Sequence, residues 1–136
     1  MKHLFSIILG LLSFCQLQAQ SWTADNGNGT FTNPLFYDEF TDPDLIRVGT
    51  DFYMVASSMH AMPGLPLLRS KDLVNWEFVT YIFDRLDLGP DFHLEGDKGI
   101  YGNGIWAPAI RYHKGTFYVF VNVNDHGLQV FSAKDP

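Results

Sequence analysis

A hairpin pattern that occurs twice constrains the fold of this chain more than any other feature of the sequence. Residues 45–56 and 110–121 each hold two short runs of apolar, aromatic and β-branched residues around a turn that contains glycine. Runs of this kind on either side of a glycine turn are typical of paired antiparallel strands. The turn predicted in the second copy, 113–116, is one residue longer than the turn predicted in the first, 49–51. Helix signals are nearly absent, so we expect an all-β protein.

The two copies lie a nearly constant number of residues apart. Ile46 and Ile110 are separated by 64 residues, and Phe52 and Phe117 are separated by 65. A fixed period on this scale indicates stacked structural units, such as the blades of a β-propeller.

Two further strands, 67–70 and 76–79, are predicted after the first hairpin, with a turn between them at 71–75. Four short antiparallel strands in sequence are typical of one propeller blade. Residues 129–135 resemble residues 68–72 in their residue types, so we expect the strand pattern of the first blade to recur in a second blade. Propellers use about 4–8 blades, whereas this sequence supplies the first blade and most of a second. We therefore expect it to be the N-terminal part of a longer protein.

The first nineteen residues have the pattern of a secretory signal. Lys2 provides a basic start, an apolar run follows at 4–14, and cleavage is expected after Ala19. This predicts a secreted or periplasmic protein, because the segment is too short to remain as a membrane anchor. Cys15, the only cysteine, would leave with the signal, so no internal disulfide is expected. The alternative, a lipoprotein with lipid on Cys15, is disfavoured by the bulky Phe14 before it.

The charge balance bears on the partners of the chain. It holds 15 Asp and Glu against 9 Lys and Arg, and loss of the signal would remove Lys2 and leave a formal charge of −7. An acidic protein is a poor match for the phosphate backbone of nucleic acid, which attracts a basic face. Aromatic residues make up 15% of the chain, which suits a β-rich core and also surfaces that stack on sugars. We expect no nucleic-acid partner and no membrane span.

The segment Thr-Asp-Pro-Asp places two carboxylates, Asp42 and Asp44, around Pro43 at the start of the first hairpin. A proline fixes its own φ and biases the residue before it toward an extended conformation, so we expect Asp42 to be extended and stiffly held. Glycoside hydrolysis requires a carboxylate at a fixed position relative to an acid. The alternative is a plain turn, in which Asp44 caps a strand and Asp42 faces water.

Several segments, in this order, resemble glycoside hydrolase family 43 in its β-xylosidase and α-L-arabinofuranosidase branch. The most specific are Ser-Lys-Asp-Leu-Val-Asn-Trp at 70–76 and Trp-Ala-Pro at 106–108. The others are found at 33–35, 41–44, 46–49, 51–53, 57–58 and 63–64. The resemblance covers about residues 33–136. Together with the signal pattern, it divides the chain into a signal peptide (1–19), an N-terminal extension (20–32) and an incomplete propeller domain (33–136).

The resemblance implies a five-bladed β-propeller that hydrolyses xylosides or arabinofuranosides with inversion at the anomeric carbon. The family's general base is the Asp before the proline of the first blade, which corresponds to Asp42. A Glu general acid and an Asp that tunes its pKa are implied beyond Pro136, so the chain alone is expected to be inactive. The family often has Pro at the position of Thr41 and Ser at the position of Asp44, which leaves the sub-branch open.

Three further residues are candidates for substrate binding. Trp106 opens the second blade as Asp42 and Pro43 open the first, and it would either stack on a sugar or pack between blades. Met59 and His60 lie in a predicted loop, 59–66, in a region that borders the substrate in the family. His60 would either hydrogen-bond a sugar hydroxyl or be an ordinary exposed loop residue.

No metal site or cofactor is predicted from the residues. His93, His113 and His126 do not have the spacing of metal ligands. A structural calcium occurs in some family members, with ligands expected beyond this sequence. Two functions remain open at this point: a glycosidase acting on xylan- or arabinan-type plant polysaccharide, and a carbohydrate-binding or inactive propeller. Asp42 favours the enzyme, since a binding module has no need for a base there.

Overall fold

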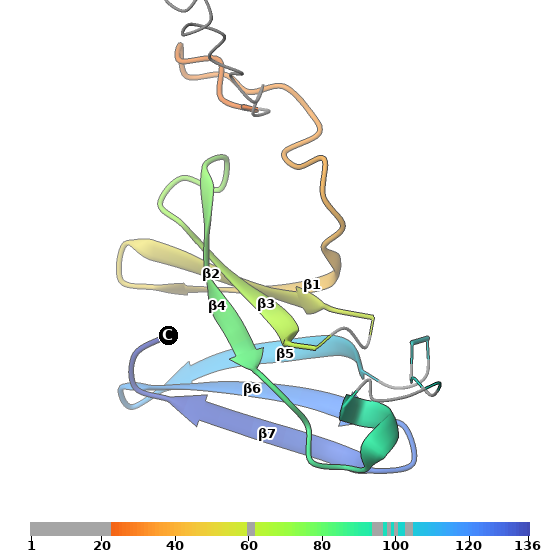
Figure 1. Cartoon of the computed structure of the whole chain (residues 1–136). Helices are drawn as coiled ribbons and strands as arrows, with labels where there is room; N and C mark the ends of the chain where they lie inside the picture. The colour runs from red at the N-terminus through yellow and green to blue at the C-terminus, as the bar shows by residue number, and fades with distance from the viewer. Residues whose placement is uncertain (1–22, 60–61, 94–96, 98, 100, 103–104) are drawn as a thin grey trace, which may run out of the picture.

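Seven strands and one short 3₁₀ helix are assigned within residues 23–59, 62–93, 97, 99, 101–102 and 105–136, the part of the chain that the computed structural model describes (Figure 1). The first sheet has the order β1-β2-β3-β4, and the second has the order β5-β6-β7. The first sheet comprises β1 (Thr41–Val48), β2 (Asp51–Ser57), β3 (Gly64–Ser70) and β4 (Trp76–Phe83). The second comprises β5 (Ile105–His113), β6 (Thr116–Val123) and β7 (Gly127–Ala133), and the 3₁₀ helix η2 (Pro90–His93) lies between the sheets in sequence.

Both sheets are antiparallel meanders, so the prediction of an all-β fold is confirmed. The predicted number of five blades stays a prediction. None of the helices in the described residues is long and apolar enough to cross a membrane.

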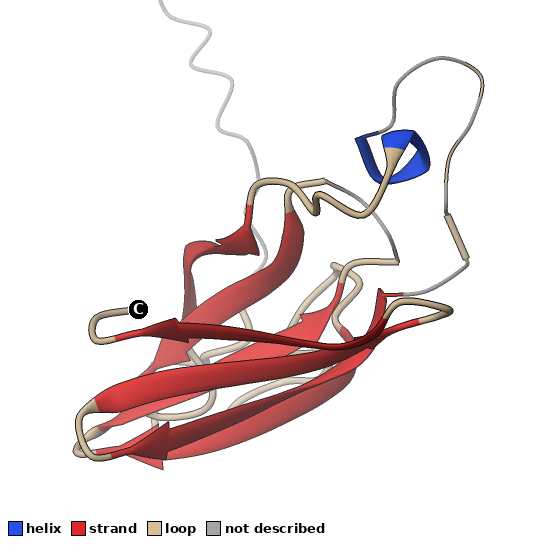
Figure 2. Cartoon of the chain, turned by 90° about the horizontal axis from the view of Figure 1, so that it is seen from below, coloured by secondary structure: helices blue, strands red, loops and turns tan. Residues whose placement is uncertain are grey.

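The hydrophobic core lies between the two sheets, which are stacked on one another in Figures 1 and 2. β5, the first strand of the second sheet, packs against both β1 and β2. Most of the core residues come from β2, β3, β5 and β6. They include Tyr53, Val55, Leu65, Leu67, Ile105, Ile110, Phe117, Val119, Val121 and Val123.

The two hairpins have turns of equal length but different backbone conformation. Val48 pairs with Asp51 and His113 pairs with Thr116, so each turn has two residues. The prediction that the second turn is one residue longer is therefore wrong. In the second turn both central residues have positive φ, Lys114 at 47° and Gly115 at 79°, as a type I′ hairpin turn requires.

The register makes the repeat spacing a uniform 65 residues. Arg47 pairs with Phe52 and Tyr112 pairs with Phe117, so the true counterpart of Ile46 is Arg111, not Ile110 as the apolar pattern indicated. The apolar pattern is offset by one residue between the two copies because the two sheets turn opposite faces toward each other.

β1, β3 and β5 each begin at least three residues earlier than predicted. β1 starts at Thr41, four residues before the predicted strand, and β5 starts at Ile105, five residues before it. β3 starts at Gly64, so the predicted loop 59–66 is shortened at its end. Gly64 is required by packing: a Cβ there would lie 2.3 Å from the ring of Phe83, the last residue of β4.

Candidate active site

β1 and β5 begin with the same irregularity. The pairing of β1 with β2 skips Asp42 and Pro43, and the pairing of β5 with β6 skips Ala107 and Pro108. In each case the residue before the proline has a positive φ, 49° at Asp42 and 43° at Ala107. The expectation of an extended Asp42 is therefore wrong, because the bulge overrides the local preference before proline. Bulges of this kind re-aim side chains and are common beside active sites.

Ser57 connects these two bulges. It is the last residue of β2, pairs with Thr41 and is 3% exposed. Its Oγ lies 3.1 Å from Asp42 Oδ2 and 2.7 Å from the backbone nitrogen of Ala107. The Ala107 N–H can only donate, so Ser57 Oγ accepts there and gives its single hydrogen to the Asp42 carboxylate. Asp42 itself is exposed, with its carboxylate oriented by this hydroxyl.

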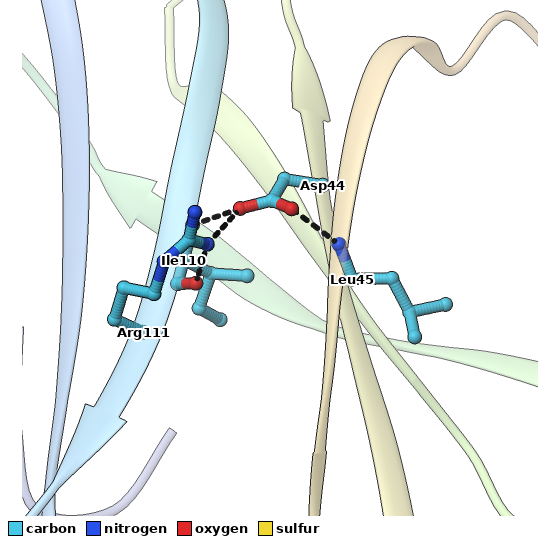
Figure 3. A network of polar contacts seen from close by, with 4 residues as sticks. All are labelled: Asp44, Leu45, Ile110 and Arg111. Atoms are coloured by element: carbon cyan, nitrogen blue, oxygen red, sulfur yellow. Dashed lines mark hydrogen bonds and ion pairs between the residues drawn. The ribbon is translucent and has the colours of Figure 1, made fainter.

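Asp44, the second acid of the Thr-Asp-Pro-Asp segment, is hydrogen-bonded to other groups than Asp42 is. Its Oδ2 accepts the backbone N–H of Ile110 at 2.8 Å and a hydrogen from Arg111 Nη1 at 2.5 Å (Figure 3). Its Oδ1 accepts the N–H of Leu45 at 3.1 Å. Asp44 is half-buried and joins β1 to β5, so its carboxylate is engaged in holding the sheets together.

A small cavity of about 150 Å³ lies beside Ser57. Its walls are formed by Glu39, Ser57, Ser58, Met59 and Tyr101. The buried Oγ of Ser58 has no hydrogen-bond partner among the atoms that the structure describes. Ligand pockets usually measure about 300–1,000 Å³, so this cavity by itself is smaller than a usual ligand pocket.

Ser57 lies close to two of the predicted site residues, Asp42 and Met59. Asp42 bonds to Ser57, and Ser57 and Met59 line the same cavity. Trp106 is half-buried, opposite Asn122, and directly precedes Ala107, whose N–H reaches Ser57. His60, the remaining predicted residue, lies outside the described residues.

Ser57 is the residue whose role sequence reasoning missed. It belongs to the Ser-Ser segment of the family resemblance at 57–58, a segment for which the sequence alone predicts no function. The one signal available was a polar residue at the end of a strand that is otherwise apolar from Met54 to Ala56. Its partner Ala107 lies 50 residues away in the sequence, so the contact depends on how the sheets pack.

The segment 70–76, the most specific part of the resemblance, forms a structural turn. Ser70 Oγ accepts the N–H of Asp72 at 3.1 Å and of Leu73 at 2.9 Å. Hydrogen bonds from the side-chain amide and then the backbone of Asn75 hold the pKa of the Asp72 carboxyl well below its usual range. Trp76 Nε1 donates to the carbonyl of Leu73 at 3.0 Å, in keeping with a packing role.

Within the part of the chain that the structure describes, no three His, Cys, Asp or Glu side chains are grouped as a metal site requires.

Comparison with known proteins places these features in a family. The model of glycosyl hydrolases family 43 matches residues 31–136. A β-xylosidase of Formosa agariphila is 40% identical over 118 residues, which cover 87% of this chain and 20% of that protein. A non-reducing end α-L-arabinofuranosidase of Bacteroides ovatus is 41% identical over 111 residues, which cover 79% of this chain and 20% of that protein. The chain thus spans about a fifth of the length of these curated relatives.

Solved structures agree with the sequence matches. The bifunctional GH43-CE protein of Bacteroides eggerthii superposes with a TM-score of 0.69 at 38% identity, covering 76% of this chain and 13% of that one. A GH43 glycoside hydrolase engineered to display endo-xylanase and exo-arabinofuranosidase activity has the same TM-score at 36% identity, covering 76% of this chain and 20% of that one. The family match includes both sheets and the two proline bulges. This chain belongs to glycosyl hydrolases family 43.

Proposed function

We propose that the protein carrying this chain is a secreted or periplasmic glycoside hydrolase that cleaves bonds to xylose or arabinose in plant polysaccharides or their oligosaccharides. Its relatives support this substrate class, since they are named as a β-xylosidase and an α-L-arabinofuranosidase. The signal-like pattern of the first nineteen residues supports export. In this proposal the two sheets are the first and second blades of a five-bladed propeller.

Asp42 is the general base of the proposed reaction. Its carboxylate takes a proton from a water molecule, whose oxygen forms a bond to the anomeric carbon on the face opposite the leaving group. The bond from that carbon to the leaving oxygen breaks as a carboxylic acid gives that oxygen a proton. In an inverting enzyme the two carboxyl groups stand about 6.5–9.5 Å apart, so that the water and the sugar ring both fit. By the family resemblance, the acid is a Glu on a later blade.

The observation that carries this proposal is the contrast between the two acids of the Thr-Asp-Pro-Asp segment. Asp44 is engaged by two donors from the second sheet, whereas Asp42 is exposed and held by one hydroxyl. A base that activates water must be reachable by that water and must also be fixed in direction. Asp42 meets both conditions. Met59, which lines a cavity with Ser57, and Trp106, which directly precedes Ala107, are the candidates for contact with the sugar.

The stereochemistry of the product tests this reaction directly. The complete gene product would be incubated with aryl β-xyloside and aryl α-L-arabinofuranoside, and the anomer released first would be identified by proton NMR. We expect turnover of at least one substrate, with inverted configuration in the first sugar formed. Sugar binding without turnover would instead support a carbohydrate-binding propeller, and retained configuration would exclude Asp42 as a general base.

A further inference from the structure

Ser57 is a buried polar residue in an apolar setting. It is 3% exposed and follows three residues of β2, Met54, Val55 and Ala56, that are 7%, 0% and 0% exposed. A buried hydroxyl is costly unless it is hydrogen-bonded. Ser57 meets this requirement through the Asp42 carboxylate on β1 and the Ala107 N–H on β5.

The backbone alone does not fix the Asp42 carboxylate. The positive φ of 49° sets where the side chain leaves the strand, but an exposed Asp can rotate about its side-chain bonds among several staggered positions. A hydroxyl donor that is itself buried and held in place selects one of them. Ser57 is held in place because its oxygen is anchored by the Ala107 N–H at 2.7 Å, the shorter of its two bonds.

We propose that Ser57 is a positioning residue for the reaction proposed above, which aims the Asp42 carboxylate by linking it to the backbone of the second sheet. The link places the base relative to β5, the strand that carries Trp106. Ser57 does not touch the reacting atoms in this role, and it acts through Asp42. The inference rests on the proposed role of Asp42 as general base.

A purely structural role for Ser57 would look different in experiment. In that case the bond to Ala107 would hold β2 against β5, and its loss would lower stability without a specific effect on turnover. The two roles are separated by measuring kcat, KM and thermal stability together on the same variants.

The test compares Ser57→Ala and Ser57→Thr in the complete gene product, with Ser70→Ala as the matched control. Ser70 is also 3% exposed and ends a strand, but its Oγ accepts the N–H groups of Asp72 and Leu73 in a structural turn. We expect Ser57→Ala to lower kcat about tenfold to a hundredfold with little change in KM, as misplacement of a catalytic group does. Ser57→Thr keeps the hydroxyl and should restore most of kcat, whereas Ser70→Ala should lower stability and keep the wild-type kcat.

A double variant separates this inference from the proposed function. In an Asp42→Asn background, Ser57→Ala should cause no further loss of residual turnover, because Ser57 acts through the carboxylate that is already gone. Wild-type kcat in Ser57→Ala, or an equal loss in both backgrounds, would overturn the positioning role while leaving Asp42 as the base. If Ser57→Ala is too unstable to assay, a kcat of Ser57→Thr far below wild type at wild-type stability would also overturn it. Full activity in Asp42→Asn alone would instead overturn the proposed function.

Discussion

Asp44 on β1 and Arg111 on β5 form an ion pair that joins the two sheets, with 2.5 Å between Asp44 Oδ2 and Arg111 Nη1 (Figure 3). The same oxygen accepts the backbone N–H of Ile110 at 2.8 Å. Asp42, two residues earlier, is exposed and bonds to the hydroxyl of Ser57. The two acids of one short motif therefore have separate roles, one in holding the sheets together and one in the proposed chemistry.

Asp44→Ala should destabilise the protein more than Arg111→Ala does. Removing Asp44 leaves the N–H of Ile110, a residue that is 1% exposed, without its acceptor, which costs about 1–3 kcal/mol. Removing Arg111 breaks an ion pair whose side chains are 60% and 31% exposed, and such pairs contribute roughly 0–1 kcal/mol. Urea unfolding of the complete gene product would measure both changes. An equal or larger loss in Arg111→Ala would show that the ion pair, and not the backbone contact, joins the sheets.

Trp106→Ala should raise KM several-fold if its ring stacks on the sugar, since aromatic contacts contribute about 0.5–1.5 kcal/mol beyond the area they bury. Trp106→Phe keeps a ring and should keep most of the affinity. Steady-state kinetics on aryl glycosides, with a thermal melt of each variant, would measure this. A large drop in melting temperature at unchanged KM would instead assign Trp106 to packing between the sheets.

Asp72 should make the turn between β3 and β4 sensitive to acid. Hydrogen bonds from Asn75 lower the pKa of its carboxyl in the folded protein, so its contribution to stability is complete above the unfolded-state pKa of about 3.9. That contribution is lost as the pH falls through the lower, folded-state pKa. Asp72→Ala should therefore be less stable than wild type at pH 7, and the difference should shrink progressively below about pH 4. Melting temperatures across this pH range would show it, and a difference that stays constant would contradict it.

Much of the local structure could be predicted from the sequence. The hairpins at 45–56 and 110–121 follow from short apolar runs around glycine turns, and both are present. The register of the repeat could not be predicted by matching apolar residues. The first sheet turns Ile46 toward the core and leaves Leu45 42% exposed, whereas the second buries Ile110 and exposes Arg111. A shift of one residue moves a strand's side chains to the other face, so matching Ile46 to Ile110 misplaced the repeat by one.

The sequence predicts Asp42 as a site residue from its place before a proline, and this role stays a prediction. Its backbone conformation could not be predicted, because a bulge set by strand pairing outweighs the local preference. Ser57 and the inter-sheet role of Asp44 were missed, since their partners lie 50 and 66 residues away in the sequence. Contacts of this range depend on the packing of two sheets, which no local pattern encodes.

Turnover by Asp42→Asn, compared with Asp44→Asn, tests the central claim most directly. Both substitutions remove one carboxylate from the same segment with almost no change in shape, so a difference between them reflects position. In the complete gene product we expect Asp42→Asn to lower kcat about 10²–10⁴-fold, the usual contribution of a general base, while xylo- or arabino-oligosaccharide binding measured by calorimetry is retained. Asp44→Asn should keep kcat near wild type and lose stability. Wild-type turnover in Asp42→Asn would contradict the account.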